Sequence, residues 1–291
     1  MKKYLCCLLL WVCVPLAWAK PPVPSLWKVS DADNSIYLLG SFHMLKPGDY
    51  PLAPNVEAAF ADSAKVVFEV APSEDELADS MLFMQAGTQK NGKTLQETLS
   101  RKTWKALQVY GERNQFPVQT LQQFKPWMAG MLIQIHEAQK QGLEPKLGLD
   151  LHFMQRAKKA GKTTAGLETF QSQIELFDAM DAPVQEQMLQ EGLDGVRQSK
   201  VFLDKLHAAW RQGDDKTLLR LGLQDWVKQY PQLYKSIMVD RNNAWLPQLQ
   251  ALLADNTQGN TLVIVGALHL LGDDGLLKRL SAQGFRVQRL R

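Results

Sequence analysis

The stretch Thr261-Leu262-Val263-Ile264-Val265-Gly266-Ala267-Leu268-His269 is an apolar, β-branched run that ends in Gly-x-x-His. Residues 36–43, Ile-Tyr-Leu-Leu-Gly-Ser-Phe-His, show the same order. A short apolar run is typical of a buried strand, and glycine lets the backbone turn sharply where the strand ends. If the two strands are neighbours, their histidines converge at the carboxyl edge of one sheet. The pattern predicts an α/β fold with His43 and His269 at that edge.

The rest of the chain supplies further strands and two helix-rich regions. Residues 26–30 and 35–40 flank a turn-forming tetrapeptide and predict a hairpin. Other strands are expected at 65–70, 162–168 and 285–290, and helices at 55–61, 146–160 and 275–283. Apolar residues recur at helical spacing from about 73 to 145 and from 169 to 253. We therefore expect one domain, residues 20–291, with a central mixed sheet and a large helical insertion in these two stretches.

The first nineteen residues have the features of a signal peptide. Lys2 and Lys3 form a basic region, residues 5–16 are apolar, and Ala17-Trp18-Ala19 has the small-x-small pattern that signal peptidase cleaves. The apolar run is shorter than the roughly 18 residues that a membrane span needs. We expect cleavage after Ala19, a periplasmic or secreted protein, and no stable membrane anchor after cleavage. An uncleaved anchor is the alternative.

The composition is that of a globular protein, with 45% hydrophobic and 22% charged residues, which disfavours a disordered chain. Removing the leader leaves 31 basic and 30 acidic residues. This balance gives no electrostatic basis for binding nucleic acid or an anionic membrane. The leader also contains every cysteine, Cys6, Cys7 and Cys13. The mature chain therefore has no thiol nucleophile, and any metal must be held by nitrogen and oxygen atoms.

Three carboxylates are candidates to join the histidines: Glu69, Asp150 and Glu168. Glu69 lies in an apolar strand, where an acid is costly unless it is paired or coordinated, so it is the most informative. Imidazole and carboxylate together suit a divalent ion such as Zn, Mn or Co. The alternatives are an ion pair of Glu69 at the sheet rim and helix capping by Asp150 and Glu168.

This ordered set of motifs resembles the TraB/GumN/Tiki superfamily, and most closely its bacterial GumN-like branch. The matching segments, in order, are residues 38–43, 66–69, 148–150, 166–168, 240–245 and 265–269. The resemblance implies an α/β core with a helical insertion. For the Tiki branch it implies a metal-dependent protease that uses manganese or cobalt. Related erythromycin-esterase-like proteins use an equivalent histidine as a base, and haem-binding lipoproteins are similar at a greater distance.

Carried over by motif, His43 and His269 would be two metal ligands, or one ligand and one base. Glu69 would be a ligand or a general base, and Asp150 a further ligand. The bound ion would lower the pKa of water and polarise a scissile carbonyl group. The resemblance thus implies a periplasmic metal-dependent hydrolase acting on a peptide or a small molecule.

The same resemblance gives catalytic roles to Arg241, Asn242 and Glu168. Arg241 and Asn242 would face the cleft, where the guanidinium stabilises developing negative charge, and Glu168 is the alternative general base to Glu69. A structural ion pair of Arg241 with Asp150 or Glu168 is the simpler alternative. Two other functions stay open: a metal-free hydrolase with His43 as the base oriented by Glu69, and a non-catalytic protein that binds a peptide or haem.

Overall fold

The computed structural model describes residues 20–90, 92–197, 200–255 and 259–291, so the predicted signal peptide and its cleavage site lie outside the described residues. The centre of the molecule is a six-stranded sheet with the order β4-β3-β5-β2-β1-β6. Its strands are β1 (Leu26–Ser30), β2 (Ser35–Ser41), β3 (Ser63–Val70), β4 (Thr163–Glu168), β5 (Asn260–Gly266) and β6 (Arg286–Arg289). The first four in spatial order run parallel, whereas β1 and β6 pair antiparallel. The predicted mixed α/β sheet and its hairpin are confirmed.

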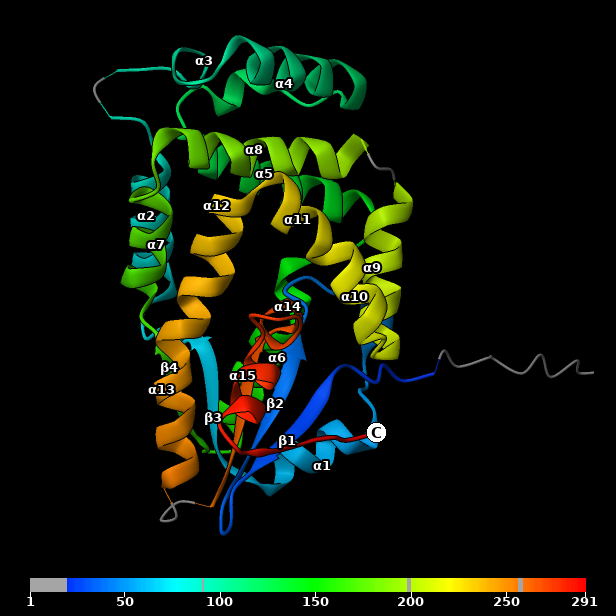
Figure 1. The fold of residues 1–291 in the computed structure, drawn as a ribbon. Helices are drawn as coiled ribbons and strands as arrows, with labels where there is room; N and C mark the ends of the chain where they lie inside the picture. The colour runs from blue at the N-terminus through cyan, green and yellow to red at the C-terminus, as the bar shows by residue number, and fades with distance from the viewer. Residues whose placement is uncertain (1–19, 91, 198–199, 256–258) are drawn as a thin grey trace, which may run out of the picture.

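The two Gly-x-x-His strands, β2 and β5, are neighbours in the middle of this sheet. Every residue of β2 is buried, as are the five central residues of β5, Thr261 to Val265, because helices cover both faces of the sheet. Figure 1 shows α13 (Arg241–Ala254) and α15 (Leu276–Ala282) in front of the strands and α6 (Leu149–Lys159) behind them. In the β2–β5 ladder Gly40 is opposite Val265 and Ser41 is opposite Gly266. Both motifs therefore leave the sheet at the same level.

The helix-rich segments pack together beyond the carboxyl ends of the parallel strands, as Figure 1 shows. Most of these helices share a core that includes Trp127, Met128 and Leu189 and is separate from the core of the sheet, whereas Trp210 and Leu218 pack in the core of the sheet. The first segment contains α2 (Glu76–Gly87), α3 (Leu95–Thr98), α4 (Arg101–Asn114) and α5 (Pro126–Lys140). The second contains α7 (Phe170–Asp178), α8 (Ala182–Arg197), α9 (Lys200–Gln212), α10 (Asp215–Gly222), α11 (Gln224–Gln229) and α12 (Pro231–Tyr234). Two further helices are α1 (Pro54–Asp62) and α14 (Ala267–Leu270).

Side chains of helix α9 bind the end of β2 and the loop that follows it. The indole Nε1 of Trp210 donates to the carbonyl oxygen of Gly40 at 2.9 Å. His207 Nε2 lies 2.8 Å from Asp49, a carboxylate that is 1% exposed and that also binds Arg211. These contacts fix the chain on both sides of the His43 loop. Within the described ranges, no helix is long and apolar enough to cross a membrane.

Candidate functional site

The ends of β2 and β5 bring the two predicted histidines together around Gly266. A methyl group added at Gly266 would lie 3.2 Å from Glu69 Oε1, 3.4 Å from His43 Nε2 and 3.5 Å from His269 Cδ2. The two imidazoles therefore approach to within twice 3.5 Å of each other at these atoms, although they are 226 positions apart in the chain. An added methyl group would be tight against Glu69 and in ordinary contact with the two imidazoles, so a longer side chain would fill the space that these three groups enclose.

His43 is bound to Asp150, which lies in the first turn of α6. The distance from His43 Nδ1 to Asp150 Oδ2 is 2.8 Å, and the Ser41 hydroxyl donates to the same oxygen at 2.6 Å. The start of α6 reaches this loop because Gly148 has no side chain: an added methyl group would overlap the His43 carbonyl oxygen. Asp150 thus fixes one ring nitrogen, while the other points toward Gly266.

The His43 ring is open to solvent, with 62% of its side chain exposed. The negative charge of Asp150 raises the pKa of His43 to about 9, and partial loss of water around the protonated ring opposes this rise. Water screens part of this attraction because the ring is exposed. The pair is a titratable imidazole that is held by a carboxylate and accessible from outside.

Glu69 lies at the end of β3 and is 7% exposed. Its Oε1 accepts from the backbone N–H of Gly266, and its Oε2 accepts from Arg241 Nη2, both at 2.6 Å. Burial opposes ionisation and is the largest single effect, but the charge of Arg241, together with the two histidines and the Gly266 amide, outweighs it and holds the pKa of Glu69 well below its ordinary value. Glu69 is therefore an ionised carboxylate with both oxygens bound, which makes it a poor proton acceptor.

Arg241 opens α13 and connects four side chains. Its Nε and Nη2 donate to Glu168 at 3.2 and 2.7 Å, and Nη2 also donates to Glu69. Its Nη1 lies 3.1 Å from His269 Nε2, and its guanidinium lies 4.5 Å from the centre of the Trp245 ring. Of the two partners that the sequence suggested, Arg241 binds Glu168 and not Asp150. Trp245 follows Arg241 by four helical positions, a spacing that places both on one face.

His269 is enclosed, being 4% exposed. Burial of the ring lowers the pKa of His269 to about 3, so the ring is neutral at ordinary pH. Its Nδ1 lies 2.8 Å from Asn242 Oδ1. We therefore assign the proton to Nδ1, which donates to Asn242, and the lone pair to Nε2, which accepts from Arg241 Nη1.

Hydrogen bonds already engage two of the predicted metal ligands. His269 Nε2 has a single lone pair, which accepts from Arg241 Nη1, whereas each oxygen of Glu69 accepts one hydrogen bond and keeps a second lone pair. Across the part of the chain that the structure describes, no three His, Cys, Asp or Glu side chains form a group that could hold an ion. The guanidinium of Arg241 supplies the positive charge among these groups. Asp150, expected as a further ligand, binds His43 instead.

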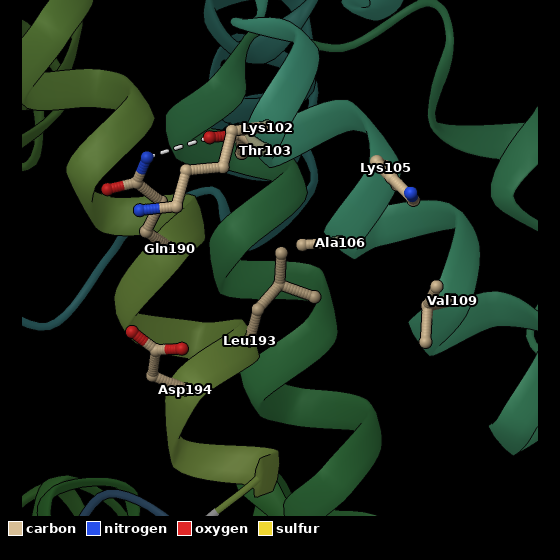
Figure 2. Close-up of a pocket in the computed structure, with 8 residues that line it drawn as sticks. All are labelled: Lys102, Thr103, Lys105, Ala106, Val109, Gln190, Leu193 and Asp194. Carbon is tan, nitrogen blue, oxygen red and sulfur yellow. Dashed lines mark hydrogen bonds between the residues drawn. The ribbon is translucent and has the colours of Figure 1, made fainter.

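Two hollows lie on different parts of the surface. One, with a volume of about 580 Å³, adjoins the ends of β3 and β4 and includes Glu168 in its wall. Figure 2 shows the other, between α4 and α8, where Gln190 donates to Thr103 at 2.7 Å. In Figure 1 this second hollow lies in the outer part of the helical region, away from the strand ends. Only the first adjoins the predicted site residues.

Sequence comparison places these residues in a known group of proteins. Residues 25–289 match the sequence profile of the TraB/PrgY/gumN family. The "Uncharacterized protein YbaP" of Escherichia coli K12 is 26% identical over 266 residues, which cover 85% of this chain and 88% of that protein. Its namesake in Shigella flexneri is also 26% identical, over 84% of this chain and 87% of the relative. No solved structure matches the chain.

Proposed function

The chain belongs to the TraB/PrgY/gumN family, and on this premise we propose that it is an exported hydrolase of peptide bonds. The observation that carries the proposal is the His43–Asp150 pair, whose free imidazole nitrogen points at the strand end beside Glu69. The leader sequence supports a periplasmic or extracellular place of action. The resemblance to peptide- and ester-cleaving relatives supports hydrolysis.

In the proposed reaction His43 is the general base. Its Nε2 takes a proton from a water molecule as that water attacks the carbonyl carbon, and then gives the proton to the departing amine. Asp150 holds Nδ1 and stabilises the imidazolium that forms in between, the part that a carboxylate plays in a catalytic triad. The residues alone suggested Glu69 as the orienting carboxylate, but Asp150 is the one bound to His43.

The remaining residues position the site. Arg241 directs its donors at Glu69, Glu168 and His269. Glu69 in turn accepts the Gly266 amide and fixes the end of β5. We therefore assign Arg241, Glu168 and Asn242 to the support of the strand ends rather than to proton transfer. No step of this mechanism uses a metal ion bound by Glu69 or His269.

The test is cleavage of a defined peptide library by the purified protein, followed by mass spectrometry. His136 on α5 offers a matched control, since it is a histidine outside the site. The wild type and His136→Ala should release the same fragments, while His43→Ala should release none. Cleavage by His43→Ala at the wild-type rate would refute the proposal. Peptide recovered intact from a stable complex with the wild type would instead support the non-catalytic binding function.

A further inference from the structure

The two edge strands of the sheet differ in how they are protected. β6 carries Arg286 and Arg289 among its four residues, and charged side chains on an edge discourage pairing with another chain. β4 has the sequence Thr-Thr-Ala-Gly-Leu-Glu and pairs with β3 in an unbroken register. It has neither a proline nor a bulge, and its one charge is at the last position. The β4 edge therefore lacks the usual features that prevent strand addition.

The free edge of β4 also has few hydrogen-bond partners. Because β3 is its single neighbour in the sheet, half of the β4 backbone groups point away from the ladder. Gln248 Nε2 donates to the Leu167 carbonyl at 2.7 Å. The described residues make no other hydrogen bond to the β4 backbone from outside its ladder with β3. An extended chain could satisfy these groups directly.

The hollow beside this edge has one sign of charge. Its wall includes the end of β4 and three acidic residues, Glu74, Asp75 and Asp79, and contains no lysine, arginine or histidine. Asp75 caps α2 by accepting from the Ala78 amide. Glu74 and Asp79 make no ion pair with any residue that the structure describes. Two uncompensated carboxylates beside an open strand edge are complementary to a strand that carries lysine or arginine.

The carboxyl end of β4 is linked by hydrogen bonds to the residues around Gly266. Glu168, the last residue of β4, accepts two hydrogen bonds from Arg241, which binds Glu69 in turn. A strand laid along β4 would therefore pass Glu168, which is one end of this network, while β3 and β5 lie between β4 and the strand that precedes His43. We propose that an extended peptide with basic side chains binds as an additional strand on β4, with those side chains in the acidic hollow. This inference rests on the proposed function, because the bound peptide would be the substrate of the hydrolase. Binding can nevertheless be measured without turnover.

The test uses His43→Ala, so that no cleavage can occur. The probe is a fluorescent octapeptide of alternating lysine and valine, compared with the same peptide carrying N-methyl groups on alternate amides. Methylation removes backbone donors and should weaken binding by about tenfold or more. Hydrogen exchange should slow in residues 163–168 when the peptide binds and stay unchanged in residues 286–289, the other edge. Equal affinity for the two peptides, or protection elsewhere than β4, would overturn the proposal.

The charge of the hollow is tested separately in Glu74→Gln/Asp79→Asn. This variant should bind the lysine peptide several-fold more weakly at low salt, with a reduced salt dependence. An unchanged affinity would overturn the assignment of basic side chains to the hollow. Binding at β4 without cleavage by the wild type would refute the hydrolase and support this inference. Cleavage by the wild type with no binding to His43→Ala would support the hydrolase and refute the binding of a peptide strand at β4.

Discussion

Asn242 holds His269 at two points. Its Oδ1 lies 2.8 Å from the ring Nδ1, and its Nδ2 donates to the backbone carbonyl of the same histidine at 3.2 Å. The same amide nitrogen also donates to the Asp274 carbonyl at 2.9 Å. Both the rotation of the ring and its tautomer are therefore set by one side chain. The lone pair on Nε2 of His269 is therefore directed toward Arg241.

Removing the Asn242 side chain should alter both the tautomer of His269 and the stability of the protein. Asn242→Ala leaves buried donors and acceptors on His269 and Asp274 without partners, which should cost about 1–3 kcal/mol of unfolding free energy. Urea unfolding measures this loss. The ¹⁵N chemical shifts of His269 should show a mixture of tautomers in the variant and one tautomer in the wild type. A single unchanged tautomer in the variant would show that Asn242 does not set it.

Loss of the proposed base should abolish turnover without unfolding the protein. His43→Ala removes an exposed ring, so its thermal midpoint should match that of the wild type. Its rate of peptide hydrolysis should fall by about 10²–10⁴-fold, the usual contribution of a general base. The check is initial rates at equal folded concentrations, with His136→Ala as the control. A fall no larger than that of the control would assign the base elsewhere.

The pH profile should follow the deprotonation of His43. A base acts in its neutral form, and the pKa of His43 is raised to about 9 by Asp150. Below that pH, kcat/KM should rise by about tenfold per pH unit and then level off. In Asp150→Asn the raising charge is gone, so the rise should move to lower pH, toward the ordinary histidine pKa of about 6.5. Identical midpoints in the two proteins would contradict the pairing.

The buried ion pair of Arg241 should matter chiefly for stability. Arg241→Met leaves Glu69 ionised and without its counter-charge, at a cost of about 3–5 kcal/mol. The double variant Arg241→Met/Glu69→Gln should recover part of that loss, because no lone charge stays buried. Denaturant unfolding of both variants measures the difference. Arg286→Met, on the exposed edge strand, is the control and should leave the midpoint unchanged.

The same pair makes the fold sensitive to acid. The folded-state pKa of Glu69 lies below its unfolded value, so its stabilising contribution is present above the unfolded pKa and is lost as the pH falls through the folded one. Glu69→Gln should therefore show a shallower loss of stability below about pH 4 than the wild type. Unfolding curves across this acidic range provide the measurement.

Metal content separates the two hydrolytic mechanisms. In the proposed reaction His43 is the base and no metal ion takes part, so turnover should survive dialysis against a chelator. Elemental analysis before and after dialysis is the measurement. One divalent ion per chain, removed together with activity and restored by manganese, would contradict this expectation and favour the metal-dependent enzyme that the family resemblance implies.

The strands were predictable because their signal is local. The runs at 36–39 and 262–265 are each followed by glycine, the run at 65–70 is rich in β-branched residues, and all three are strands in the structure. Their order in the sheet was not predictable from such runs. The position of β5 between β3 and β2 depends on which faces α1, α6 and α13 cover, and those contacts join residues far apart in the chain.

The sequence predicted which residues form the site better than it predicted which of them bind one another. His43, His269 and Glu69 do gather at Gly266, as two glycine-terminated strands suggest. The binding of His43 to Asp150 had no signal in the spacing, because the two are 107 positions apart and meet through a close contact at Gly148. Ser41 and Trp245 were missed, although one lies inside the Gly-x-x-His motif and the other is one helical turn from Arg241.

β5 comes late in the chain and yet stands in the middle of the sheet. A polypeptide that ends before Asn260 lacks the partner that joins β3 to β2, and with it Gly266 and His269. Such a fragment, whether still emerging during synthesis or produced by proteolysis, would hold His43 and Glu69 on two unjoined halves. The group of residues around Gly266 therefore assembles only when nearly all of the protein has been made.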